Sequence, residues 1–488
     1  MRKHKIKTSL YLFIASIFVF VATAIAIIIS QGGSVTETGV QTNMGVLRIN
    51  IYPENTNYSL YVDDVAVENI INKGVNLPSG IKDIRIESVG MNSWKKKVEI
   101  QEGIVKDIFV KLFPTELKLE QVTNTNVSKM VFSQNGDYLF YTVENNPILT
   151  ENGIWRLQIE NNNLFIFNTN QNLIKFAELN DELKLMLNDE KVSLIPSPDN
   201  NKMLVISPLN QKITLLNNAL GNEALKSIDL VSLLGFFPES IDWLNDSVSM
   251  IIKDKTTLFE YNLTNNKTTL IKYSQKESLV YGYNETQLIW FDPLGKSLNT
   301  YKNESNQPII FPNDVIFNKV NQIYLPEKSL RYALISDSNE FLFVDLEKKT
   351  IQKTGLASDS NELFSISADA TTYLFKNVSG TMISLVAREN LALQKIEINL
   401  YNFEDPQVLK DKIAFTPKDS TIITYSDSLK SIFSSDQDGT NKNLIINNEN
   451  IKPFFNTDSR LENLYLLMND GQEELSNANI YKINLLLD

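Results

Sequence analysis

The sequence predicts an all-β protein with an N-terminal transmembrane helix, a small β-sandwich and a seven- or eight-bladed β-propeller. Three observations lead to this fold class. Residues 9–29 form an uncharged apolar run, and apolar residues alternate with polar ones from 46 to 112, which is the pattern of strands. From residue 115 onward, a unit of short apolar strands and polar turns recurs about every 40–50 residues, the period of a propeller blade.

Composition limits the chemistry available to this chain. Its 488 residues exceed what one hydrophobic core usually supports, so two or more domains are expected. Cysteine is absent, which excludes disulfides, thiolate metal sites and cysteine nucleophiles, and His4 is the single histidine. Residues 1–30 contain four of the 46 Lys and Arg and none of the 58 Asp and Glu. Residues 31–488 therefore have 42 basic and 58 acidic residues, a net charge of −16. Such a surface repels nucleic acid, so no nucleic-acid partner is expected.

The N-terminal apolar run is predicted to span a membrane. About 20 apolar residues cross the hydrocarbon as a helix, and residues 9–29 have that length. A cleaved signal peptide has a shorter apolar stretch and a small-residue cleavage site, and "SQGGSV" after the run fits such a site poorly, so we expect an uncleaved anchor. Basic residues before the run place residues 1–8 in the cytoplasm and the C-terminal domains outside: Arg2, Lys3, Lys5 and Lys7. This predicts a single-pass cell-membrane protein whose residues 9–29 contact the lipid bilayer.

A linker and a small β-sandwich are expected to follow the helix. Residues 30–45 are rich in Gly, Ser and Thr and lack an apolar period, which predicts a flexible linker. In residues 46–113 apolar and polar residues alternate, as Ile84 and Ile86 do with Arg85. Pro and Gly separate these runs, and no helical period is present, so the segment is predicted to be all strand.

The order of strands and turns in this segment matches a known module. The matching stretches are "INIYPENTNYSLYVDD" (49–64), "LPSGIKDIRIESVGMNSWKKKVEI" (77–100) and "GIVKDIFVKL" (103–112). They resemble the PEGA domain, with Asp64 where the family usually has the Gly of a Val-Asp-Gly turn. The resemblance implies a PEGA-like β-sandwich of a surface or envelope protein, without catalysis and often fused to other exported domains.

Residues 115–488 are predicted to form the β-propeller. The unit is an apolar strand, a polar turn and further apolar strands with a closing turn, as in "MVFSQNGDYLFYTVENN" (130–146). Eight such units can be aligned, at the spacing typical of a four-stranded blade. Seven blades remain an alternative, because the interval after the first unit is long and two weak units could be one.

The stretch "SSDQDGTNKNLI" (434–445) could be a metal loop or a turn. Asp436 and Asp438 give it an oxygen-rich composition, but the sixth and twelfth positions of a calcium loop, which should be Gly and Glu, are Asn441 and Asn447. Together with "FTPKDSTIITYSD", which precedes it, the stretch resembles the repeat of WD-repeat-like propellers of the Tol-system periplasmic type. In those repeats an Asp-x-Asp-Gly-Ser/Thr turn joins the third strand to the fourth. We therefore predict a blade turn and assign no metal.

The ends of the predicted propeller are expected to pair. The last unit ends with "NIYKINLLLD", which leaves too few residues for a fourth strand. Residues 115–122, "TELKLEQV", alternate Leu117 and Leu119 with polar residues and so have a strand pattern. We predict that they supply the outer strand of the final blade, because closure avoids an open sheet edge.

Few residues are candidates for catalysis or binding. With His4 in the predicted cytoplasmic tail, neither a Ser-His-Asp triad nor a histidine zinc site can form in the exported part. No phosphate loop or nucleotide fingerprint is present, so no catalytic, metal-ligating or cofactor-binding residue is assigned and no cofactor is expected. Trp155, Trp243 and Trp290 lie within blade units and could stack on a sugar, although packing between blades is the favoured interpretation.

Three functions are compatible with this organisation. The favoured one is a membrane-anchored extracytoplasmic scaffold of a prokaryotic cell envelope, which binds a protein or a cell-wall polymer through its propeller and is not an enzyme. A second is a propeller carbohydrate-active hydrolase that uses two carboxylates about 5–10 Å apart. A third is a structural spacer without a ligand. The ligand-binding residues are left unassigned.

Overall fold

The computed structural model divides the chain into two compact units, Met1–Glu116 with Leu486–Asp488, and Leu117–Leu485. Each unit is treated by itself. The described residues are 16–17, 19–20, 22–23, 34–36, 39–41, 44–54, 57–67, 74–159, 173–218, 226–274, 279–284, 287–302, 305–311, 317, 319–326, 329–366, 372–378, 382–386, 394–398, 413–416, 421–426, 429–436, 438–457, 462–469 and 478–486.

The predicted membrane localisation is contradicted. In the part of the chain that the structure describes, no helix is long and apolar enough to cross a bilayer. Of residues 9–29 only 16–17, 19–20 and 22–23 are described, all helical, whereas a span needs about 20 consecutive residues. The cytoplasmic tail and the lipid contact predicted for 9–29 otherwise fall outside the described residues, as does His4. Within the predicted linker, β1 (Ser34–Thr36) pairs antiparallel with β2 (Gly39–Gln41).

The first unit contains two small sheets. One has the order β6-β3-β9, with β3 antiparallel to β6 and parallel to β9, and the other has the antiparallel order β5-β4-β7-β8. A two-residue hairpin joins β4 to β5, and Asp63 and Asp64 both take positive φ there, at 50° and 63°. Asp64 thus adopts the backbone conformation for which Gly is usual. The strands are β3 (Met44–Tyr52), β4 (Ser59–Val62), β5 (Val65–Val67), β6 (Val75–Pro78), β7 (Gly80–Glu87), β8 (Trp94–Ile100) and β9 (Val105–Lys111).

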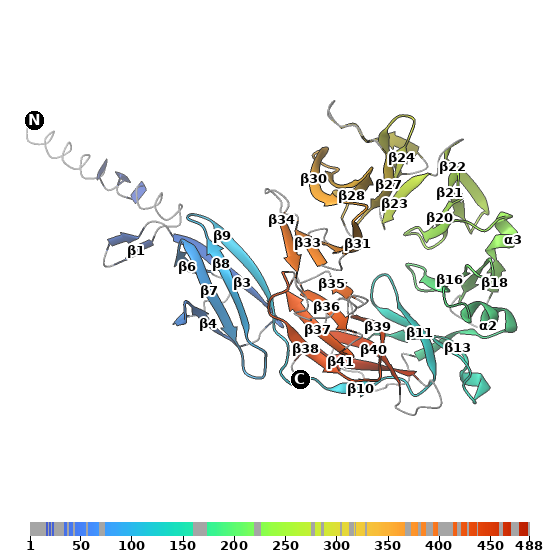
Figure 1. Cartoon of the computed structure of the whole chain (residues 1–488), viewed down its shortest axis with the longest axis horizontal. Coiled ribbons are helices and arrows are strands. Elements are labelled where there is room, and N and C mark those ends of the chain that lie inside the picture. Colours follow the sequence, from blue (N-terminus) through green and yellow to red (C-terminus); the bar gives the residue numbers. More distant parts are fainter. Residues whose placement is uncertain are drawn as a thin grey trace, which may run out of the picture. The chain divides into compact units, whose positions relative to one another are not determined.

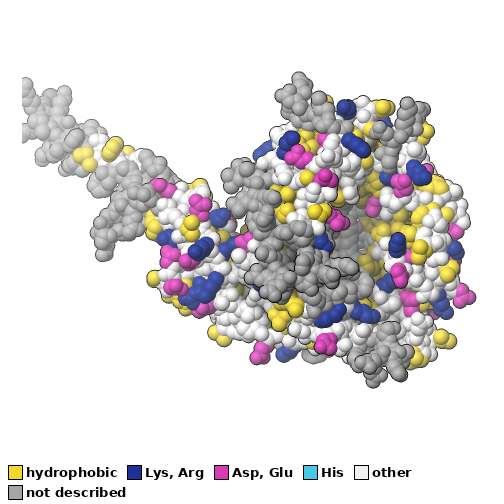
Figure 2. Space-filling view, in the orientation of Figure 1, with side chains coloured by type: hydrophobic (Ala, Val, Ile, Leu, Met, Phe, Trp, Pro, Cys, Tyr) yellow, Lys and Arg dark blue, Asp and Glu magenta, His cyan; other side chains and the backbone are white. Residues whose placement is uncertain are grey.

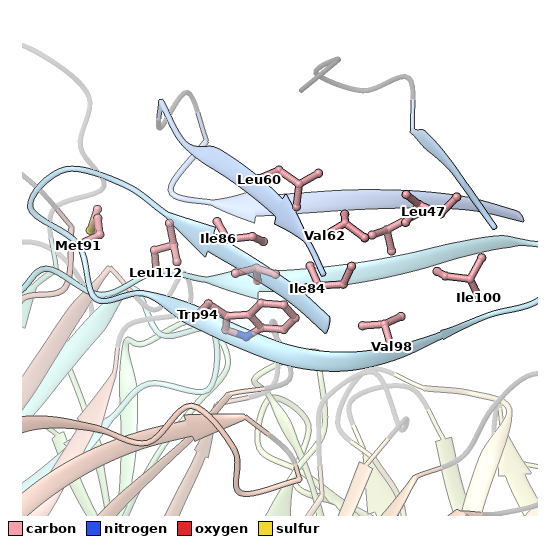
Figure 3. Close-up of a cluster of buried hydrophobic side chains, with 12 residues drawn as sticks. Leu47, Leu60, Val62, Ile84, Ile86, Met91, Trp94, Val98, Ile100 and Leu112 are labelled. Carbon is pink, nitrogen blue, oxygen red and sulfur yellow. The ribbon is translucent and has the colours of Figure 1, made fainter. Parts of the chain in front are cut away.

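These two sheets share one hydrophobic core (Figure 3). Leu47 from β3 and Val110 from β9 pack with Ile84 and Ile86 from β7, and Trp94 begins β8 against the same cluster. The alternation in the sequence produces this core, because every second side chain of a strand faces the opposite sheet.

The second unit is a propeller. Among its described residues there are eight four-stranded antiparallel sheets, and Figure 1 shows them arranged around a common centre. We number them blades 1–8 along the chain. Eight sheets confirm the eight-unit interpretation, and the long interval after the first unit contains the helix α2 (Asp181–Leu187). In blades 2, 5 and 7 most residues of the second strand are buried, since neighbouring blades cover both of its faces.

The blade strands have the following bounds. Blade 1 is β11 (Val127–Phe132), β12 (Tyr138–Val143), β13 (Gly153–Gln158) and β14 (Leu173–Glu178); blade 2 is β15 (Ser193–Pro196), β16 (Lys202–Ser207), β17 (Lys212–Asn217) and β18 (Lys226–Asp229). Blade 3 is β19 (Ser240–Trp243), β20 (Ser249–Lys253), β21 (Thr257–Asn262) and β22 (Lys267–Tyr273); blade 4 is β23 (Val280–Asn284), β24 (Gln287–Asp292), β25 (Ser297–Lys302) and β26 (Ser305–Pro308). Blade 5 is β27 (Val320–Tyr324), β28 (Tyr332–Asp337), β29 (Glu340–Asp345) and β30 (Thr350–Ala357); blade 6 is β31 (Asn361–Ile366), β32 (Thr372–Asn377), β33 (Met382–Val386) and β34 (Gln394–Ile398). Blade 7 is β35 (Ile413–Thr416), β36 (Thr421–Ser426), β37 (Ser431–Asp436) and β38 (Asn443–Asn447); blade 8 is β39 (Ile451–Thr457), β40 (Asn463–Asn469), β41 (Ala478–Asn484) and β10 (Leu119–Gln121). The short helices are η1 (Leu149–Glu151) and α3 (Leu230–Leu234) besides α2.

Apolar side chains join consecutive blades. Buried clusters link blade 1 to 2, 2 to 3, 3 to 4, 4 to 5 and 5 to 6, and a further cluster links blade 8 to blade 1. Between blades 7 and 8 the Tyr425 hydroxyl donates to the Ile451 carbonyl at 3.2 Å, and the Tyr425 ring lies 6.3 Å from the Phe455 ring. β31 and β35, the first strands of blades 6 and 7, are also neighbours, so the described blades form a ring.

The ring closes as the sequence predicts. β10 pairs antiparallel with β41, in the register Leu119 with Ile483 and Gln121 with Tyr481. The closing sheet therefore has the order β10-β41-β40-β39, with three strands from the end of the propeller and one from its beginning. The prediction that residues 115–122 supply the outer strand of the final blade is confirmed.

Candidate functional site

A pocket of about 890 Å³ lies at one end of blades 3, 4 and 5. The first strands of these blades, β19, β23 and β27, all contribute the residues with which they begin. The ends of β20 and β24 and the turn after β24 complete the wall, since Ser240 pairs with Lys253 and Val280 pairs with Phe291 across the sheets. The described lining is Ser240, Lys253, Leu279, Val280, Tyr281, Phe291, Pro293, Lys296, Lys319, Val320, Asn321 and Gln322.

The floor of this pocket is apolar and rigidly packed. Leu279, Phe291 and Val320 are 0%, 4% and 5% exposed. Leu279 belongs to the cluster between blades 3 and 4, and the other two belong to the cluster between blades 4 and 5, where the Phe291 ring meets the Phe317 ring edge-on. The floor is therefore held by the same contacts that join the blades.

A glycine allows the two inner strands beside the pocket to approach. A Cβ atom on Gly282 would lie 2.7 Å from both the carbonyl oxygen and the Cγ2 atom of Ile323. Carbon atoms do not approach backbone oxygens so closely without displacement. Gly282 in β23 therefore allows the close spacing to β27 beside the pocket.

The rim is polar, and its charged lining is basic. Lys296 and Lys319 are exposed, and among the described residues no carboxylate oxygen lies within 4 Å of either ammonium group. Lys253 is half-buried and makes an ion pair with Glu239, with 2.8 Å between Nζ and Oε2. No Asp or Glu is among the described lining residues. Within the described part of the pocket, positive charge thus stands above an apolar floor without an acidic partner at Lys296 or Lys319.

One wall of the pocket contains a buried hydrogen-bond chain. The Tyr281 hydroxyl lies 2.6 Å from Oδ2 of Asp242 and 2.8 Å from Oγ of Ser240. Burial raises the pKa of the Asp242 carboxyl, and the hydrogen bond from Tyr281 opposes part of that rise. Burial and the nearby carboxylate raise the pKa of the Tyr281 phenol, which therefore stays protonated and donates to Asp242. The chain fixes the wall but supplies a single carboxylate, whereas glycoside hydrolysis requires two.

The tryptophans considered as sugar platforms are mostly packing residues. Trp243 and Trp290 are 5% and 4% exposed within interblade clusters. Their indole N–H groups donate at 3.0 Å to the carbonyl oxygen of Ile195 and to the Asn306 side chain. Trp155 is partly buried against the cluster between blades 8 and 1. Packing between blades is thus confirmed for Trp243 and Trp290.

The Asp436 stretch is a turn, as predicted. It joins β37 to β38, the third and fourth strands of blade 7, and Gly439 takes φ +75°. The Thr440 hydroxyl donates to Asp438 at 2.6 Å, and the Asn441 amide donates to Asp436 at 3.0 Å. The acidic side chains therefore accept hydrogen bonds from within the turn.

Sequence reasoning did not identify the residues of the pocket. Lys296, Lys319 and Tyr281 belong to separate blades or turns and match no motif. One signal was available, because an isolated glycine inside the apolar strand "VYGYN" is typical of a close backbone approach, and that glycine is Gly282.

Comparison with known proteins identifies no family for this chain. No family model matches the chain, so neither the PEGA resemblance nor the Tol-type resemblance has support from one, and no curated protein matches. Similar solved structures include the WD40 domain of SCAP from fission yeast, with 9% sequence identity and a TM-score of 0.44 over 76% of this chain and 94% of that one. The RRP9 WD40 repeats are also similar, with 10% identity and a TM-score of 0.34 over 61% of this chain and 96% of that one. Hsv2 from Kluyveromyces lactis is a third similar structure, with 9% identity and a TM-score of 0.37 over 67% of this chain and 99% of that one. With TM-scores below 0.5, these likenesses add no argument to the eight sheets themselves.

Proposed function

We propose that this chain is a non-catalytic scaffold that holds a partner protein on the face of its propeller formed by blades 3–5. The observation that carries the proposal is the pocket with an apolar floor and an exposed basic rim. A rigid apolar pocket with a few polar groups at its edge is the usual form of a recognition site. Blade packing fixes the floor, so binding there requires little ordering of the protein.

The other functions considered have less support at this pocket. A two-carboxylate hydrolase would need a second acid beside Asp242, and the described lining has no Asp or Glu. A spacer without a ligand gives no reason for two lysines above an apolar floor that have no carboxylate partner among the described residues. The lipid contact is not proposed, because it depended on the membrane localisation that the described structure contradicts. No described lining residue favours a wall polymer. The proposed partner is therefore a protein.

Site-specific photocrosslinking of the full chain tests this function. A photoreactive phenylalanine analogue is placed at Lys296 on the pocket rim, or at Lys348 in the turn between β29 and β30 as a matched exposed control. The proposal expects a discrete protein adduct in cells from position 296 and not from position 348. Equal adducts at the two positions, or no adduct from the pocket position, would contradict it.

A further inference from the structure

The pocket also indicates the chemistry of the partner. Resting on the proposed function, we infer that the pocket binds a short acidic peptide segment, whose carboxylates lie at Lys296 and Lys319 and whose neighbouring apolar side chain packs on Val280 and Pro293 beside the buried floor.

Charge complementarity is the first argument for an acidic ligand. The whole chain has a net charge of −12, and Figure 2 shows basic and acidic side chains interspersed over the described part of the face in view. The pocket departs from that pattern, because its three charged lining residues are all lysines. Only Lys253 has a carboxylate partner among the described residues, so Lys296 and Lys319 keep their charge available for a ligand. Groups at a recognition surface are arranged so that opposite potentials meet.

The size and the floor of the pocket indicate a segment rather than a folded domain. Pockets of about 300–1,000 Å³ enclose drug-sized ligands, and this pocket has about 890 Å³, which suits a few side chains rather than a folded domain. Above the buried floor, the partly exposed Val280 and Pro293 offer apolar surface for one side chain. At the edge, the Gln322 side-chain oxygen accepts from the Tyr324 hydroxyl at 2.5 Å, and the Gln322 amide nitrogen carries two further N–H donors.

The same observations favour a carboxylate peptide over a phosphate group. No arginine is among the described lining residues, so the planar guanidinium fork that matches phosphate oxygens in bidentate fashion is missing from them. Inorganic phosphate also has no apolar part to cover the floor. An acidic residue beside an aromatic or aliphatic one satisfies both the rim and the floor.

Fluorescence-polarisation titration of the full chain tests the inference. The probe is a fluorescein-labelled peptide with a Glu-Phe-Glu core, compared with the same peptide carrying Gln-Phe-Gln. The test variant is the double substitution Lys296→Glu and Lys319→Glu, and the matched control is Lys348→Glu with Lys349→Glu, two exposed lysines of another turn. The four positions are on the surface, so folding should persist; circular dichroism checks this, and Lys296→Gln with Lys319→Gln serves as a milder second variant.

We expect saturable binding of the acidic peptide that is about tenfold or more weaker in the test variant, unchanged in the control, and weaker at high salt. The glutamine peptide should bind at least several-fold more weakly than the acidic one. Absence of binding, equal binding of the two peptides, or equal loss in both double variants would overturn the inference. Full displacement by inorganic phosphate would show a general anion site and would also overturn it. If one of these results is found while photocrosslinking still gives a protein adduct at position 296, the proposed scaffold function stands and the inference of an acidic peptide ligand is wrong.

Discussion

Closure of the ring depends on a side chain that links the beginning of the propeller to its end. Thr123, buried just after β10, accepts the Ile480 N–H on its hydroxyl at 2.9 Å and donates to Oδ1 of Asn479 at 3.2 Å. Both partners lie in β41, the last strand of the chain. The substitution Thr123→Val keeps the shape of the side chain and leaves the buried Ile480 N–H without an acceptor. A buried polar group deprived of its partner costs about 1–3 kcal/mol, so the free energy of unfolding should fall by that amount.

A second buried threonine provides the control for this loss. The Thr214 hydroxyl in blade 2 donates only to the sulfur of Met186 at 3.3 Å, a weak acceptor, so Thr214→Val should change stability little. Urea unfolding of the full chain compares the two variants, and hydrogen exchange follows the Ile480 amide. We expect a lower midpoint and faster exchange of this amide only in Thr123→Val. If the two variants are equally stable and the Ile480 amide exchanges as in the wild type, this account of closure is refuted.

Three further changes test the pocket and the blade turn. Gly282→Ala should destabilise the propeller by about 1–3 kcal/mol, because the new Cβ would lie 2.7 Å from the Ile323 carbonyl oxygen; unaltered thermal unfolding would contradict this. Burial raises the pKa of Asp242 in the folded protein above its value in the unfolded chain, despite the Tyr281 hydrogen bond. The folded state therefore binds this proton more tightly than the unfolded chain. The resulting stabilisation is complete below the unfolded pKa and is lost as pH rises through the folded pKa. Asp242→Asn should therefore gain stability relative to the wild type as pH rises from acid toward neutral, and parallel pH profiles of the unfolding midpoint would rule this out. Because the turn at Asp436 is satisfied by its own side chains, a chelator should leave the melting temperature unchanged, and a clear fall would mean that a metal contributes.

The sequence by itself determined the features that depend on local pattern. Alternation along single strands indicated the two-sheet core in which Ile84 and Ile86 face Leu47, and the repeated units predicted seven or eight blades, of which the structure shows eight among the described residues. It also placed Leu119 in the closing strand and Asp436 in a turn, because each of these follows from the spacing of apolar residues and from turn chemistry over a few positions. The same local reasoning predicted a membrane localisation for the N-terminal run, which the described structure contradicts.

Only the tertiary structure decided where a ligand can bind. Tyr281 meets Asp242 from a different blade, 39 residues away, and the pocket joins the beginnings of three first strands that no motif connects. The contrast between Lys253, which has an acidic partner, and Lys296, which has none among the described residues, depends on how neighbouring turns fold. A propeller repeats the same strand pattern in every blade, so the pattern that predicts the fold cannot distinguish one blade's end from another. That distinction arises from contacts between neighbouring blades, such as the approach of Gly282 to Ile323.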